Sequence, residues 1–181
     1  MNYTECIEQA RGRIGSHCKA CWECNGRACK NQMPGPGAKG IGDTAIRNYD
    51  KWKEIRVQMD TLVENRPCDT TLELFDRTFQ YPFFAGPVGA VQLHYGDCLN
   101  DISYNDILVS ACAASGIAAF TGDGTDSNVM VAATKAIKNA GGLGIPTVKP
   151  WNIEVIREKM AMVKDSGAFA VAMDIDAAGL A

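Results

Sequence analysis

Apolar residues in the second half of the chain fall into short uninterrupted runs, separated by longer stretches that are apolar on one side only. Because a short apolar run bounded by Gly, Pro or polar residues is typical of a buried strand, strands are predicted at 83–86, 117–120, 145–148 and 169–175. The one-sided stretches predict helices at 103–115, 126–140 and 153–166. Strands and helices that alternate in this way predict an α/β fold with a parallel sheet built from βα units.

The last apolar run ends in two carboxylates. Residues 169–173 are all apolar, which predicts a strand buried on both faces. Asp174 and Asp176 follow at positions i and i+2, so their side chains leave the strand on the same side. Ligands of parallel α/β folds bind at the carboxyl ends of the strands, which makes both residues candidates for a binding site. The alternative is that they cap loops or pair with a basic residue.

The first 80 residues follow a different pattern, with a cysteine-rich segment among helical and loop stretches. The pattern predicts a short helix over 3–14, a Gly/Pro-rich loop over 33–43, one long amphipathic helix over 44–65, and a hairpin or pair of short strands over 70–80. We therefore divide the chain into an N-terminal domain, 1–80, and a domain of βα units, 81–181.

Composition and charge limit the partners and the compartment. With 181 residues, 46% hydrophobic and 22% charged, the chain has the profile of a globular domain. A net charge of −3 argues against a nucleic-acid surface or a polybasic membrane anchor. No apolar run approaches the roughly 20 residues needed to cross a bilayer, and the polar N-terminus lacks the core of a secretory signal. We expect a cytoplasmic protein without nucleic-acid or membrane partners.

Four of the eight cysteines are closely spaced, at Cys18, Cys21, Cys24 and Cys29. In a cytoplasmic protein such thiols are reduced, redox-active or metal-bound rather than joined in structural disulfides. Four thiolates at this spacing can hold Zn or an Fe–S cluster, although the last step and the absence of a following Pro depart from ferredoxin-like runs. A metal site and a set of reduced or redox-switching thiols both remain open.

Polar and small residues at other strand ends are further candidates. Lys149 directly follows the buried strand 145–148, and a charge in that position favours a functional role. Trp151 either contacts a ligand or packs at the end of the sheet. The segment 121–125 (TGDGT) has two glycines, which either let backbone approach a ligand or form a simple turn. His94 is either catalytic or structural. No GxGxxG motif follows the first strand, which disfavours a dinucleotide-binding domain.

Four motifs lie at the strand ends, in this order along the chain: FAGPVGAV, IAAFTGDGTD, GIPTVKPWN and AVAMDIDAAGL. They resemble the first four strands of the FMN-dependent α-hydroxy-acid oxidase/dehydrogenase family, which includes glycolate oxidase and lactate oxidase. The segment CKACWECNGRACKNQMPG is similar to the cysteine-rich start of a bacterial branch of that family. The resemblance implies a partial (βα)8 TIM barrel of about four βα units, preceded by the Cys-rich and helical segment and truncated after the fourth strand.

The resemblance also implies roles for individual residues. It places FMN contacts at Pro87, Val88, Gly89, Thr121, Gly122, Lys149, Asp174 and Asp176. A Lys beside the flavin ring can stabilise the negative charge of the reduced ring. Trp151 stands where the family has a Tyr that touches the substrate, and it lacks the Tyr hydroxyl.

The function implied by the resemblance is FMN-dependent oxidation of a small 2-hydroxy acid such as lactate or glycolate, in a homo-oligomer when the protein is intact. The family's base histidine and phosphate-binding loops follow the fourth strand, so we expect this chain to be inactive alone and, with open sheet edges, to self-associate. Two alternatives remain: a Cys-ligated metal or Fe–S redox module, and an FMN-dependent isomerase or reductase on the same barrel, as in type 2 isopentenyl diphosphate isomerases.

Overall fold

The computed structural model describes residues 1–29 and 43–175 and divides the chain into two compact units. One unit consists of Met1–Cys68 with Gln92–Cys98, and the other of Asp69–Val91 with Leu99–Ala181. The division after Cys68 groups the hairpin, which we expected in the N-terminal domain, with the βα units. Residues 33–42 of the Gly/Pro-rich loop and Asp176 lie outside the described residues.

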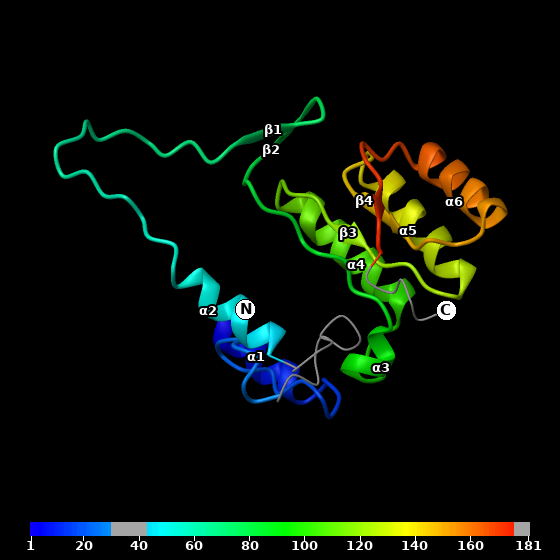
Figure 1. Cartoon of the computed structure of the whole chain (residues 1–181), viewed down its shortest axis with the longest axis horizontal. Coiled ribbons are helices and arrows are strands. Elements are labelled where there is room, and N and C mark those ends of the chain that lie inside the picture. Colours follow the sequence, from blue (N-terminus) through cyan, green and yellow to red (C-terminus); the bar gives the residue numbers. More distant parts are fainter. Residues whose placement is uncertain (30–42, 176–181) are drawn as a thin grey trace. The chain divides into compact units, whose positions relative to one another are not determined.

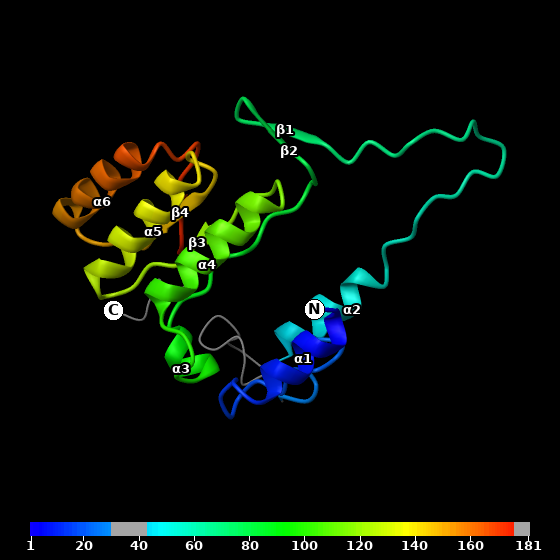
Figure 2. The same cartoon turned by 180° about the vertical axis from the view of Figure 1, so that it is seen from behind.

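The stretch Met1–Cys68 of the N-terminal unit contains helices α1 (Tyr3–Arg11) and α2 (Thr44–Trp52), and most of α3 (Val91–Tyr95) also groups with this unit. Helix α1 begins with a capping box, in which Asn2 and Glu5 each accept a backbone N–H of the other. The prediction of one helix over 44–65 is wrong, because α2 ends at Trp52 and residues 53–71 form neither helix nor strand (Figures 1 and 2).

The loss of the second half of that helix has a physical reason. The apolar side chains that made the pattern amphipathic are highly exposed, at 65% for Ile55, 86% for Val57, 81% for Met59 and 98% for Leu62. Helices gain most of their stability from packing an apolar face, so a helix without a packing partner is marginal.

The second unit opens with the predicted hairpin. Strands β1 (Leu72–Leu74) and β2 (Arg77–Phe79) pair antiparallel. Phe75 and Asp76 between them have φ of +50° and +58°, as a two-residue type I′ turn requires. The prediction of a hairpin is confirmed.

The βα units follow the predicted order. The helices of these units are α4 (Asp101–Ala114), α5 (Ser127–Asn139) and α6 (Ile153–Ser166), and the strands are β3 (Phe120–Thr121), β4 (Ile145–Val148) and β5 (Ala172–Met173). Helix α6 and strand β4 have the predicted bounds. Asn152 caps α6 by accepting the N–H of Val155, and Gly167 ends it in the left-handed conformation with φ of +70°.

The other strands are shorter than predicted. The first is reduced to a single parallel bridge between Ala85 and Ala119. The prediction that 169–173 is buried on both faces is wrong, because Val171 is 43% and Met173 54% exposed. Within the described residues, the first strand and β5 each pair with one neighbouring strand only. Each therefore has fewer backbone hydrogen bonds to extend it.

The parallel strands lie in chain order. Ala85 bridges to Ala119 beside β3, and the sheet continues β3, β4, β5, with Thr121 paired to Pro146 and Thr147 to Ala172. All carboxyl ends therefore meet at one edge of the sheet. The α/β class is confirmed, while a partial barrel stays a prediction.

Helices α4, α5 and α6 pack side by side against one face of this sheet (Figure 1). Two apolar clusters form the contact: Val109, Cys112, Ala119, Ala136 and Ile137 in one, and Met130, Val148 and Val163 in the other. Because Val148 packs among the helices and side chains alternate along a strand, Thr147 and Lys149 project from the opposite face. None of the described helices is both long and apolar enough to span a bilayer.

Candidate functional site

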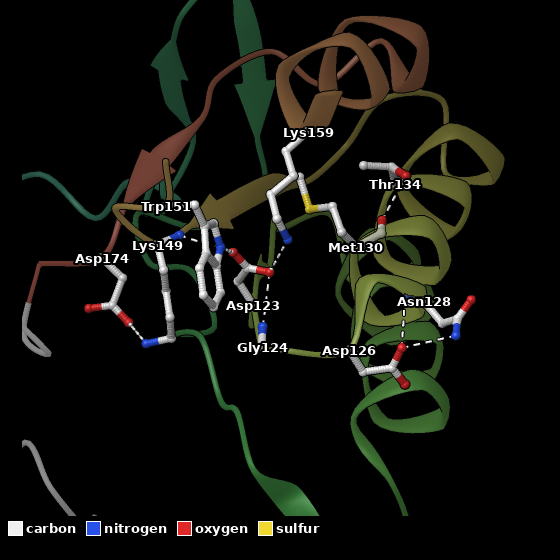
Figure 3. Close-up of polar contacts among 10 residues, drawn as sticks. All are labelled: Asp123, Gly124, Asp126, Asn128, Met130, Thr134, Lys149, Trp151, Lys159 and Asp174. Carbon is white, nitrogen blue, oxygen red and sulfur yellow. Dashed lines mark hydrogen bonds and ion pairs between the residues drawn. The ribbon is translucent and has the colours of Figure 1, made fainter. Parts of the chain in front are cut away.

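The centre of the candidate site is the carboxylate of Asp123, just after β3 (Figure 3). Its Oδ1 accepts hydrogen bonds from Lys159 Nζ at 2.6 Å and from the N–H of Gly124 at 2.9 Å. Its Oδ2 accepts from the backbone N–H of Lys149 at 3.0 Å and from the indole N–H of Trp151 at 2.7 Å. One carboxylate therefore joins the end of β3 to the end of β4 and to α6.

This carboxylate is fully buried and charged. The side chain of Asp123 is 0% exposed and that of Lys159 is 7% exposed. Burial pushes the pKa of Asp123 up, but hydrogen bonds from Lys159, from the Lys149 backbone and from Trp151 outweigh it and leave the pKa below its ordinary value. At neutral pH the group is a carboxylate paired with an ammonium.

Lys159 is a site residue that sequence reasoning missed. It lies on α6 on the same side as Val163 and Ser166, at i+4 and i+7, and all three are buried. Its ammonium also lies 5.5 Å from the centre of the Trp151 ring, within cation–π range. A lysine in the apolar stripe of a helix is the signal that could have found it, since such a charge needs a buried partner.

A second ion pair joins the carboxyl end of β4 to that of β5. Lys149 Nζ lies 2.9 Å from Asp174 Oδ2, and the two side chains are 29% and 28% exposed. The backbone N–H of Asp174 donates to the Val148 carbonyl at 2.9 Å, so the strands stay paired up to the ion pair. The structure thus brings two predicted residues together on the face of the sheet opposite the described helices, and both side chains are partly exposed.

Trp151 is oriented by its hydrogen bond to Asp123. The indole N–H is the only polar hydrogen of the side chain, and Asp123 already accepts it, while the backbone N–H of Trp151 donates to the Lys149 carbonyl. Contact between Trp151 and a substrate stays a prediction, but any such contact would come from the ring and not from a hydrogen bond.

The loop after the first strand packs tightly on the end of β3. A Cβ at Gly122 would lie 2.3 Å from the Val88 carbonyl oxygen, so only glycine fits there. Gly89 approaches the Asp123 carbonyl, with a Cβ built on Gly89 lying 3.5 Å from that oxygen. Pro87 is exposed. The structure therefore holds Pro87, Val88 and Gly89 beside the Asp123 segment.

Thr121 and Gly122 are less accessible than their expected role suggests. Thr121 is 0% exposed, and its hydroxyl has no hydrogen-bond partner among the described residues. The N–H of Gly122 donates to the Oδ1 of buried Asn105 at 3.3 Å. A flavin contact from either residue stays a prediction.

The four cysteines do not form a metal site in the structure. Cys18, Cys21 and Cys29 are half-buried and Cys24 is exposed, and all four are free thiols. Among the residues that the structure describes, no group of three or more His, Cys, Asp or Glu is placed to hold a metal ion. The sulfurs of Cys18 and Cys29 contact backbone groups instead, the Ala20 N–H at 3.5 Å and the Gly26 carbonyl at 3.6 Å. The predicted Zn or Fe–S site is not supported.

His94 lies in α3, in the stretch Gln92–Cys98 that groups with the N-terminal unit. A catalytic role for His94 stays a prediction.

Comparison with known proteins agrees with the strand-end motifs. The family model described as FMN-dependent dehydrogenase matches residues 35–181. The match covers well over half of the chain and all candidate residues from Pro87 to Asp176, and it excludes the four cysteines. Searches of curated proteins and of solved structures find no significant match. On the family match and the order of its strand ends, the chain belongs to the FMN-dependent dehydrogenase family.

Proposed function

We propose that the βα units bind FMN at their strand ends and form part of an oxidoreductase that acts on a small 2-hydroxy acid such as lactate or glycolate. The observation that carries the proposal is the Lys149–Asp174 pair, which places an ammonium, 29% exposed, at the carboxyl end of a parallel strand. The pair lies inside the region that matches the family.

The residues present fit a flavin in two respects. Lys149 offers an accessible positive charge, which suits a ring that becomes anionic on reduction. The backbone at the first strand end is open, because Gly86 and Pro87 are exposed and no described atom lies within 4 Å of a Cβ built on Gly86. Backbone can therefore approach a flat ring from that side.

When bound, FMN supplies a two-electron acceptor for the substrate hydride. In this proposal the ammonium of Lys149 stabilises negative charge on the ring, and Asp174 holds that ammonium in place. Trp151 gives the site a fixed aromatic wall, because Asp123 already accepts its indole N–H.

We further propose that these βα units are the first four of a (βα)8 barrel. The parallel strands follow one another in chain order, with no reversal among those described, as consecutive units of a barrel do. A doubly wound sheet would reverse its order at a switch point.

A flavin isomerase or reductase is a second candidate, favoured by one observation. The residue after β4 that would contact the substrate has its donor committed to Asp123, so Trp151 offers no hydrogen bond to a substrate carboxylate. If the bound flavin changes its absorbance with prenyl diphosphates and not with lactate or glycolate, this second function replaces the first.

Flavin binding is the direct test. FMN added to the purified chain should lose fluorescence with a saturable curve, and K149M should weaken binding about tenfold, the loss expected for one charge-assisted contact. The matched control is K138M, because Lys138 forms an exposed ion pair with Asp165 on the helices. Lactate or glycolate should then perturb the absorbance of the bound flavin. Equal affinity of K149M and the unsubstituted chain would contradict the assignment of Lys149.

A further inference from the structure

Asp123 divides its two oxygens between different tasks. Oδ1 accepts from Lys159 and the adjacent Gly124, whereas the partners of Oδ2 among the described residues both follow β4: the backbone N–H of Lys149 and the indole N–H of Trp151 (Figure 3). Oδ1 therefore anchors the carboxylate to Lys159, and Oδ2 holds the backbone of Lys149 and the indole of Trp151.

We infer that Asp123 is a positioning residue of the flavin site: anchored by Lys159, it fixes the ring of Trp151 and the backbone of Lys149 and so directs the Lys149 ammonium. The inference rests on the proposed flavin function and adds to it a residue that touches neither flavin nor substrate.

The cost of burying this pair argues for such a role. Burying an ammonium and a carboxylate carries a desolvation penalty that their attraction does not always repay, so apolar residues of similar size are often as stabilising. What apolar residues cannot supply is an acceptor for the two N–H groups after β4. A half-buried indole N–H without this acceptor would no longer be held in one orientation, and the backbone N–H of Lys149 would lose its hydrogen bond.

The geometry predicts an asymmetric result for Asp123→Asn. The ammonium of Lys159 has only donors, so it holds the amide oxygen of Asn. The amide NH2 then faces the two N–H groups of Lys149 and Trp151, donor against donor, and both hydrogen bonds are lost. If Lys159 is also replaced, as in D123N/K159M, the amide is free to turn its oxygen back to these N–H groups.

The experiment compares NMR signals and flavin affinity. In 15N-labelled full chain, W151F identifies the indole N–H signal of Trp151, which D123N should move upfield. FMN affinity should fall about tenfold, as for loss of a charge-assisted contact. D126N is the matched control, because Asp126 lies in the same loop but caps α5 through Asn128 and should leave both measurements unchanged.

A second pair of variants covers the case in which D123N fails to fold. D123N/K159M and D123L/K159M both lack the buried charges, and only the first keeps an oxygen for Lys149 and Trp151. The first should keep the downfield indole signal and a measurable FMN affinity, and the second should lose both.

Each outcome decides the inference. An indole signal that stays in place in D123N overturns it, and so does a shifted signal with unchanged FMN affinity, which would leave Asp123 a purely structural group. If the unsubstituted chain binds no FMN, the proposed function fails and the positioning role fails with it. A shifted indole in that case shows that the hydrogen bond is real and that the error lies in the flavin assignment.

Discussion

The two ion pairs at the strand ends are chemically alike and physically different. Lys159 lies 2.6 Å from Asp123, and Lys149 lies 2.9 Å from Asp174. The first pair is 7% and 0% exposed at its side chains, and the second is 29% and 28% exposed. A buried charge cannot exchange its partner for water, whereas a half-exposed charge can rearrange around a ligand. We therefore expect the Lys159–Asp123 pair to stabilise the fold and the Lys149–Asp174 pair to contact a ligand.

The largest expected effect is the loss of one buried partner. K159M leaves the Asp123 carboxylate buried without its ammonium, which should lower the free energy of unfolding by about 3–5 kcal/mol. D123L/K159M should recover much of this loss, because no unpaired charge remains. Urea denaturation followed by circular dichroism measures both variants. If K159M is no less stable than K138M, a surface ion-pair variant, the pair is not buried as described.

Acid should destabilise the chain through the same carboxylate. The pKa of Asp123 is raised by burial but lowered more by its hydrogen bonds, and it lies below the ordinary value in the folded chain. Its stabilisation is therefore complete above the unfolded pKa of about 4 and is lost as pH falls through the lower folded pKa. Between pH 4 and pH 2 the unfolding free energy should fall less steeply in D123L/K159M.

Asp69 must be removed from that comparison, because its pKa is also lowered, by hydrogen bonds from Thr71. Both proteins in the pH series therefore carry D69N. Parallel curves for the two would show that Asp123 does not carry the acid sensitivity.

A smaller effect is expected from the close packing that precedes Asp123. G122A places a Cβ 2.3 Å from the Val88 carbonyl oxygen, a backbone atom that must shift, at a cost of about 1–3 kcal/mol. G124A is the control, because no described atom lies within 4 Å of a Cβ at Gly124. Thermal unfolding should separate the two variants, and equal midpoints would contradict the packing of the first-strand loop on the end of β3.

The smallest effect on stability should come from the half-exposed pair. K149M should change the unfolding free energy by less than about 1 kcal/mol, as is usual for partly solvated pairs. The same substitution should weaken FMN binding, so the exposed pair affects the ligand more than the fold. A loss of stability as large as that of K159M would remove the distinction between the two pairs.

Local sequence signals were reliable where an element carries its own ends. Helix α6 was predicted with the bounds that the structure shows, because Asn152 caps its start and Gly167 its end. The hairpin of β1 and β2 was predicted for a similar reason, since alternation and the turn lie within a few residues.

Predictions failed where a partner decides the outcome. The helix predicted over 44–65 ends at Trp52, because its apolar face meets no core and Leu62 is 98% exposed. The spacing of the four cysteines was compatible with a metal site, but the described thiols do not converge. Spacing along the chain sets which residues can meet and does not make them meet.

The sequence by itself determined the α/β class, the order of the βα units and the strand-end motifs that identify the family, because these features are local patterns repeated along the chain. Only the tertiary structure decided which charges form which pairs. Asp123 meets Lys149, Trp151 and Lys159 across 26, 28 and 36 residues. Contacts over such sequence separations depend on how strands and helices pack. The burial of Asp123, and with it the buried ion pair, exists only after this packing.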